Sequence, residues 1–130
     1  MKRIEVVAAV IHHQNKILAV QRGPAKYAYI SEKWEFPGGK MEAGETEEQT
    51  IIREIREELD MQITVQSKLL TIEHPYPDFQ LTMHTYLCQS AQSEPKLTEH
   101  LAFRWLTMDE LEELDWAGAD VPIVEALINK

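Results

Sequence analysis

The sequence predicts an α/β protein in which a mixed β-sheet is covered by helices. Strand-like segments lie on both sides of one clear helix, and hairpin-like pairs of strands coexist with a longer crossover connection. The chain has 130 residues, of which 44% are hydrophobic and 27% charged, as is ordinary for a globular domain. We therefore expect one domain over residues 1–130.

Short β-prone segments supply the sheet. Residues 6–11 and 17–21 are apolar and flank a polar turn, so they are expected to pair as a hairpin. Residues 22–31 have the composition of a loop, and Pro37-Gly38-Gly39 ends a short extended piece at residues 34–36. Further strands are expected at residues 62–70, 80–88 and 103–106.

The clearest helix covers residues 46–59. Thr46 and Gln49 form a capping-box pattern, and no Gly or Pro follows before the expected end near Asp60. A second such pattern, Thr107 with Glu110, predicts a helix near the C-terminus, and Asp120 is expected to open a last helix that runs through residue 127.

The charge of the chain restricts its partners. A formal net charge of -9 would repel a polynucleotide, so a phosphate-bearing substrate would need a divalent cation to offset the repulsion. The single cysteine, Cys88, cannot form an internal disulfide, which fits the cytoplasm. No apolar stretch approaches the roughly 18 to 20 residues that span a bilayer, so we expect no membrane partner.

Three carboxylates share one side of the predicted central helix. On a helical wheel Glu54, Glu57 and Glu58 fall within an arc of about 100°, next to an apolar face. Such an acidic face is ordinarily just solvated. Here, however, a glycine pair lies upstream, where backbone groups can approach an ion or a phosphate closely, and a divalent cation would relieve the repulsion between the carboxylates.

The segment from Gly39 to Met61 resembles the Nudix box, Gly-x5-Glu-x7-Arg-Glu-U-x-Glu-Glu-x-Gly-U, where U is aliphatic. Every fixed position matches except Asp60, which stands where the family has a glycine that caps the helix. Residues 34–40 and 4–11 are similar to the branch that contains MutT and the CTP pyrophosphohydrolases. The resemblance implies an α/β/α sandwich around a central mixed sheet. It also implies a hydrolase dependent on Mg2+, or on Mn2+ in its place, that releases nucleoside monophosphate and pyrophosphate from a nucleoside triphosphate.

The resemblance also implies roles for individual residues. Glu54, Glu57 and Glu58 match the family's catalytic metal ligands, and the Gly39 carbonyl is similar to its backbone ligand. Glu99 matches a further position that the family can use at the metal and in catalysis. The general base is then either Glu54 or Glu99, with Glu54 the first choice.

Several other residues are candidates for supporting the chemistry. We expect Arg53 to point away from the acidic arc and to clamp Glu45, which would fix the loop to the helix. Arg22 and Lys40 are the nearest cations for a phosphate contact, although either is as readily an ordinary surface charge.

The base pocket is the least determined part of the prediction. Asp120 can accept a hydrogen bond from an exocyclic amine such as cytosine N4, or it can simply cap the last helix. Tyr76 and Phe79 can stack on a base or close the core.

Asp120 favours (d)CTP or a modified pyrimidine triphosphate as the substrate. The alternatives are a MutT-type 8-oxo-dGTP diphosphatase that sanitises the nucleotide pool and a non-catalytic Nudix domain that binds a nucleotide as a regulator. We expect the protein to be a monomer or a homodimer.

Overall fold

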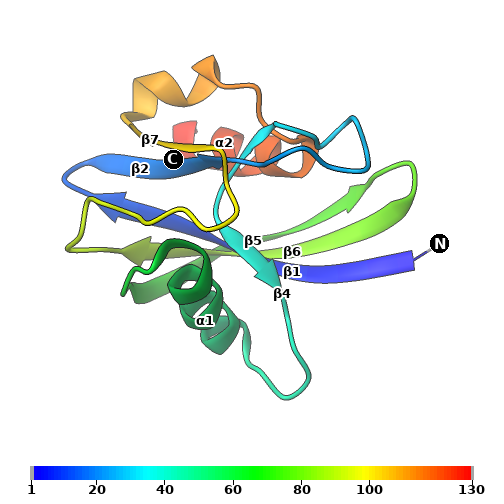
Figure 1. Ribbon diagram of the computed structural model, residues 1–130, viewed down its shortest axis with the longest axis horizontal. Coiled ribbons are helices and arrows are strands. Elements are labelled where there is room, and N and C mark those ends of the chain that lie inside the picture. The colour runs from blue at the N-terminus through cyan, green and yellow to red at the C-terminus, as the bar shows by residue number, and fades with distance from the viewer. Residues whose placement is uncertain (1, 130) are drawn as a thin grey trace.

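In the computed structural model the predicted sheet is present and mixed (Figure 1). The structure describes residues 2–129, so Met1 and Lys130, the ends of the predicted domain, lie outside the described residues. The strands are β1 (Lys2–His13), β2 (Lys16–Gln21), β3 (Trp34–Glu35), β4 (Gly38–Lys40), β5 (Thr64–Pro75), β6 (Phe79–Gln89) and β7 (Ala102–Leu106). Their order is β3-β2-β1-β6-β5, with β4 paired to β1 and β7 paired to β2. Strand β1 is parallel to β6 and antiparallel to β2 and β4, which makes the sheet mixed.

The predicted β1–β2 hairpin is confirmed. His12 lies opposite Ile17, and the turn residues Gln14 and Asn15 both have positive φ, which is the backbone geometry that a tight hairpin turn requires. The strand predicted at residues 62–70 is wrong in its bounds, because β5 begins at Thr64 and continues to Pro75. Residues 71–75 extend the strand beyond its predicted end, because they pair with β6 and because Ile72 is buried.

Helix α1 (Glu47–Leu59) has the predicted cap and the predicted end. Thr46 accepts a hydrogen bond from the backbone N–H of Gln49, whose side chain accepts from the backbone N–H of Thr46. Asp60 ends the helix in the left-handed conformation, with φ 51° and ψ 44°, and donates its N–H to the Arg56 carbonyl. The local sequence therefore fixes both ends of the helix that carries the candidate carboxylates.

Replacing Asp60 by glycine is expected to stabilise the fold by about 0.5–1 kcal/mol, because a side chain in the left-handed region is strained. For a domain of this size this corresponds to a rise in Tm of roughly 2–5 °C. Thermal unfolding followed by circular dichroism measures it, with Asp60→Ala as the control that should lower Tm. A lower Tm for the glycine variant would contradict the prediction.

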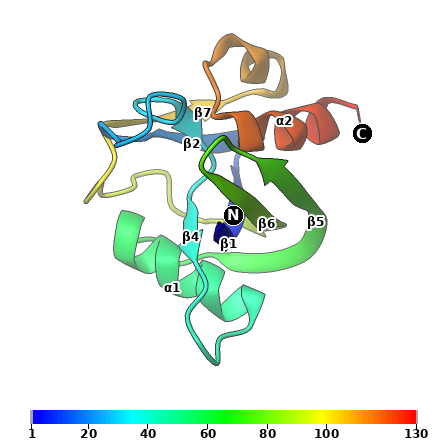
Figure 2. The same ribbon diagram turned by 90° about the vertical axis from the view of Figure 1, so that its right-hand side faces the viewer.

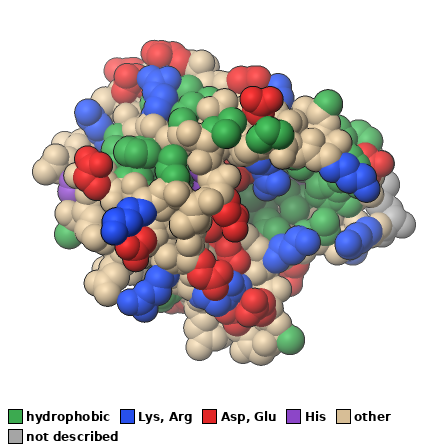
Figure 3. Space-filling model, viewed as in Figure 1, with side chains coloured by type: hydrophobic (Ala, Val, Ile, Leu, Met, Phe, Trp, Pro, Cys, Tyr) green, Lys and Arg blue, Asp and Glu red, His purple; other side chains and the backbone are tan. Residues whose placement is uncertain are grey.

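Two layers of helix cover the sheet, as the sandwich prediction requires (Figures 1 and 2). Helix α1 lies on one side, and α2 (Val121–Ile128) with the 3-10 helix η1 (Met108–Glu113) lies on the other. The capping box of Thr107 and Glu110 is present, but it begins this 3-10 helix rather than an α-helix. A short 3-10 turn, η2 (Gly118–Asp120), runs directly into α2. On the face shown in Figure 3 the side chains leave a hollow floored by hydrophobic residues.

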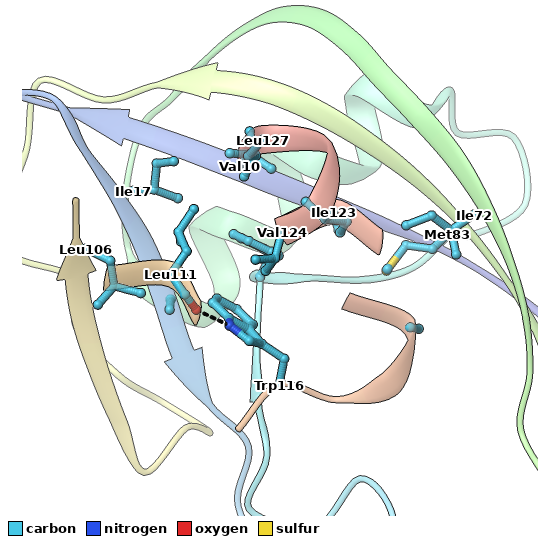
Figure 4. Packing of buried hydrophobic residues seen from close by; sticks show 14 of the residues in the cluster. Val10, Ile17, Ile72, Met83, Leu106, Leu111, Trp116, Ile123, Val124 and Leu127 are labelled. Carbon is cyan, nitrogen blue, oxygen red and sulfur yellow. Dashed lines mark hydrogen bonds between the residues drawn. The ribbon is translucent and has the colours of Figure 1, made fainter. Parts of the chain in front are cut away.

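Alternate residues of β1 build two separate cores. Val7, Ala9 and Ile11 face α1, whereas Ala8 and Val10 face α2, which explains why this central strand is apolar on both sides. The α2 core is shown in Figure 4, where Trp116 donates its indole N–H to the Leu111 carbonyl at 2.6 Å. Cys88 is buried in the α1 core, and burial raises the pKa of its thiol to about 12, in keeping with a packing role. In the described part of the chain no helix is long and apolar enough to cross a membrane.

Candidate active site

The glycine pair Gly38-Gly39 lies in β4, and at Gly39 the backbone of this strand lies directly against α1. Strand β4 pairs with β1, so that a Cβ atom at Gly38 would overlap the Val7 carbonyl and one at Gly39 would overlap the Glu54 carboxylate. At Gly38 the overlap is with backbone, so only a residue without a side chain fits there, whereas a side chain at Gly39 would displace the Glu54 carboxylate. The structure thus places Gly39 beside Glu54, two residues that the sequence analysis assigned to one site.

Arg53 links the loop before α1 to the helix. Its Nε and Nη2 atoms donate to the two Glu45 oxygens at 2.6 and 3.0 Å, and Nη2 also donates to the Lys40 carbonyl at 3.1 Å. The expectation that Arg53 points away from the acidic arc is wrong, because Nη1 lies 3.0 Å from Glu54 Oε1 and 3.2 Å from Glu57 Oε1. The guanidinium is long enough to bridge both sides of its own turn, so it orients two of the arc's carboxylates as well as Glu45.

The three carboxylates of the arc differ in burial. Glu57 is 57% exposed, Glu54 is 14% exposed, and Glu58 is buried, with no hydrogen-bond partner for its Oε1 atom among residues 2–129. Burial is the main cause that raises the pKa of Glu58 to about 9, and the nearby carboxylates of Glu54, Glu99 and Glu35 raise it further. Burial also raises the pKa of Glu54, more than Arg53 lowers it. A group of mutually repelling acids therefore surrounds Glu58.

A loop tied to the end of α1 brings Glu99 into this group. The Lys96 N–H donates to the Leu59 carbonyl at 2.8 Å, and the Thr98 hydroxyl donates to the Glu58 carbonyl at 3.1 Å. On the other side the Leu101 N–H donates to the Gln21 carbonyl at 2.9 Å. These bonds hold the loop between α1 and β2. The role of Thr98 was not predicted, since its partner is a backbone carbonyl 40 residues away in the sequence.

The donor chemistry suits a hard divalent cation. Within residues 2–129 no three His, Cys, Asp or Glu side chains are already arranged to hold a metal ion. The residues nevertheless fit one: carboxylate oxygens predominate, Glu58 Oε1 is buried without a partner, and the Gly39 backbone is pressed against Glu54. Oxygen ligands of this kind are those that Mg2+ prefers.

A cleft with a volume of about 370 Å3 opens beside the acidic group. Figure 3 shows its apolar floor, with Lys and Arg side chains at the rim and acidic side chains along one side. The sheet contributes the floor through Ile4, Val6, Leu81 and Met83. A pocket of this volume that combines an apolar floor with polar groups around it is typical of a small-molecule site.

Asp120 is buried at the cleft and does not cap α2. Its Oδ2 atom accepts the Phe36 N–H at 2.8 Å, and the side chain makes no capping hydrogen bond, so the helix-cap interpretation is wrong. The reason is that η2 continues into α2, which gives Asp120 a helical backbone and turns its side chain inward. Burial is the main cause that raises the pKa of this carboxyl group well above its usual range, and Glu35 adds to it.

The aromatic residues form a connected wall. Tyr76 and Phe79 line the cleft but are only 7% and 8% exposed, and the Tyr76 hydroxyl accepts the Ala119 N–H at 2.9 Å. Tyr29 stacks on Tyr76 with ring centroids 5.1 Å apart and on Tyr27 at 5.3 Å. Tyr27 also lines the cleft. Tyr27 was not predicted as a site residue, because nothing in the sequence of its loop indicates a contact with this wall.

The predicted cations lie at the same cleft. Arg22 Nε donates to Glu35 Oε1 at 3.1 Å, and both residues line the cleft with Lys40. Lys2, which the sequence analysis did not single out, also lines it. The structure therefore brings Arg22, Lys40 and Asp120 to a cleft that begins at Gly39.

An acidic helix beside an apolar cleft that carries Lys and Arg side chains suits a phosphate-bearing ligand, and comparisons with known proteins show the class of protein. A family model described as NUDIX domain matches residues 6–126. A CTP pyrophosphohydrolase of Escherichia coli K12 is 35% identical, covering 98% of this chain and 93% of that protein. An 8-oxo-dGTP diphosphatase of the same strain is 31% identical, covering 98% of each. The chain belongs to the Nudix family and is a Nudix hydrolase with pyrophosphohydrolase activity on nucleotides.

Solved structures support the fold. A DNA mismatch repair protein MutT of the Nudix hydrolase family, from methicillin-resistant Staphylococcus aureus 252, is 42% identical with a TM-score of 0.76, covering 99% of this chain and 98% of that chain. A MutT protein from Methanosarcina mazei Go1 has a TM-score of 0.87 at 18% identity, covering 98% and 94% of the two chains, and shows the fold alone. The predicted sandwich around a mixed sheet is thereby confirmed.

Proposed function

We propose that this Nudix hydrolase is a magnesium-dependent pyrophosphohydrolase that converts a nucleoside triphosphate into the monophosphate and pyrophosphate. The observation that carries the proposal is that Glu54, on the helix face it shares with Glu57 and Glu58, lies against Gly39, which lines the same cleft as Asp120. Nudix hydrolases generally need a divalent metal, and the oxygen donors at this site suit Mg2+, with Mn2+ as a substitute.

The residues divide into three tasks. Glu54, Glu57, Glu58 and the Gly39 carbonyl would hold the metal, with Glu99 as a further ligand from the loop. A bound magnesium ion would neutralise phosphate charge and activate a water. Arg22 and Lys40 face the cleft with the charge needed to bind the triphosphate.

The proposed reaction is substitution at the β phosphorus. The water oxygen bonds to that phosphorus while the bond to the oxygen that bridges the α and β phosphates breaks. Glu54 takes the proton from the water, and Glu99 is the second candidate for this role, because both carboxylates adjoin Glu58. The products are the nucleoside monophosphate and pyrophosphate.

Hydrolysis in oxygen-18 water is expected to place the label in pyrophosphate, because the β phosphorus receives the water oxygen. Mass spectrometry of the two products measures this, and phosphate analysis tests for a different first product. Label in the monophosphate, or inorganic phosphate as the first product, would exclude substitution at the β phosphorus.

For the base we propose cytosine or a modified pyrimidine. Asp120 uses Oδ2 for the Phe36 N–H, and its second oxygen is left to pair with an exocyclic amine. The similarity to a CTP pyrophosphohydrolase supports this preference. The second candidate is an 8-oxo-dGTP diphosphatase, which the similarity to enzymes of that name favours.

Asp120→Asn is expected to change the ratio of kcat/KM for CTP and 8-oxo-dGTP by a few-fold to about 100-fold, since it exchanges one acceptor for a donor. Stability should change little, because the Asn oxygen can still accept the Phe36 N–H. A panel of triphosphates with magnesium, scored by pyrophosphate release, measures the ratio. If base preference and Tm both stay unchanged, Asp120 does not read the base.

A further inference from the structure

Glu35 connects two parts of the molecule that the proposed reaction uses. Its Oε1 atom accepts from Arg22 Nε at 3.1 Å, and its Oε2 atom pairs with His100 Nε2 at 3.3 Å. Glu35 is 17% exposed and lines the nucleotide cleft. His100 directly follows Glu99 in the loop held against α1. A three-residue chain, His100–Glu35–Arg22, thus runs from that loop to the cleft.

The His100 side chain has one polar contact in the described part of the chain. It is 6% exposed, its Nδ1 atom is buried without a partner, and Nε2 pairs with Glu35. An ionised carboxylate only accepts hydrogen bonds, so Nε2 carries the hydrogen. The backbone beside it is fixed by the bond between Leu101 and Gln21. His100 is therefore a fixed donor aimed at Glu35.

Glu35 needs such a donor to keep its orientation. Its charge lies close enough to Glu58 and Asp120 to act on both, and those carboxylates repel it. Among the described residues, Arg22 and His100 are the two whose side chains pair with the Glu35 carboxylate. Arg22 is 46% exposed, and a long exposed side chain loses its preferred rotamer readily when its partner moves.

We propose that His100 is a positioning residue that, through Glu35, holds the Arg22 guanidinium in the cleft for substrate binding. The kinetic consequence rests on the proposed function of the cleft, whereas the positioning itself does not. Among the described residues the hydrogen bonds from His100 run through Glu35 to Arg22, so His100 acts chiefly on substrate binding, while the charge of Glu35, which His100 leaves in place, acts on Glu58.

Kinetics separate this role from plain packing. With CTP and magnesium, His100→Leu is expected to raise KM about five- to thirty-fold, as loss of a charge-assisted hydrogen bond does, and to change kcat less than about three-fold. His100→Gln should restore KM to within about two-fold, because its Nε2 can donate in the same direction. The matched control is His84→Leu. His84 is 12% exposed and pairs through Nε2 with Glu5 at 3.1 Å, outside the cleft, so its loss should leave KM unchanged.

A double-mutant cycle tests whether His100 acts through Glu35. If it does, His100→Leu combined with Glu35→Gln raises KM no more than Glu35→Gln alone. Effects that multiply, or equal KM changes in the Leu and Gln variants of His100, would overturn the proposal.

The Arg22 Nε–H signal in NMR provides a readout that requires no turnover. Its exchange with water should be slow in the native protein and in His100→Gln, and should accelerate at least about five-fold in His100→Leu. If the protein hydrolyses no triphosphate, the proposed function fails while this measurement still decides the positioning. Unchanged Arg22 exchange in a folded His100→Leu variant would refute it.

Discussion

Glu57→Gln is expected to lower kcat about 100-fold or more while leaving the fold intact. The Glu57 side chain is 57% exposed, and among the described residues its carboxylate hydrogen-bonds only to Arg53, so the substitution removes little packing. It does remove one of the negative charges proposed to hold magnesium, and loss of such a ligand weakens both metal binding and the chemical step.

The measurement is pyrophosphate release over a magnesium titration, together with the half-saturating manganese concentration from paramagnetic relaxation of water, which needs no turnover. Glu48→Gln is the matched control, because Glu48 is an exposed acid on the opposite side of the same helix. Removal of metal with EDTA should abolish activity in all three proteins. A near-normal kcat for Glu57→Gln at saturating magnesium would contradict its assignment as a ligand.

Arg53→Ala is expected to lower kcat/KM about 10- to 100-fold, although Arg53 is not proposed to touch the substrate. The guanidinium holds Glu45, Glu54 and the Lys40 carbonyl together, and loss of a group that orients ligands has effects of this size. Arg53→Lys should recover only part of the activity, because an ammonium group cannot make the two-point contact with Glu45. Arg56→Ala, which changes an exposed arginine of the same helix, is the control and should have near-normal activity.

The same contact predicts a pH dependence of stability. Hydrogen bonds from Arg53 are the main cause that lowers the pKa of Glu45 from 4.5 to about 2. A lowered folded-state pKa stabilises the fold above about pH 4.5, and this contribution is lost as the pH falls towards 2. The Tm of the native protein should therefore fall further between pH 6 and pH 3 than the Tm of Glu45→Gln does. Parallel Tm curves for the two proteins would show that the ion pair does not contribute.

The parts of the site that lie close together in the chain are predictable from the sequence. The capping box at Thr46, the left-handed end at Asp60 and the shared arc of Glu54, Glu57 and Glu58 depend on the geometry of one helix. Helix periodicity fixes which side chains share a face whatever the helix packs against. For that reason the acidic helix follows from the sequence alone, whereas the nucleotide-hydrolase class was implied by the resemblance of the Gly39–Met61 segment to the Nudix box.

The direction of individual side chains was decided only by tertiary structure. Asp120 turns to the Phe36 N–H instead of capping α2, and His100 pairs with Glu35, across separations of 84 and 65 residues. These outcomes depend on which buried polar groups lack other partners once the sheet and helices have packed. Local sequence does not encode that competition, since each buried donor or acceptor is satisfied by whichever distant group the fold brings to it.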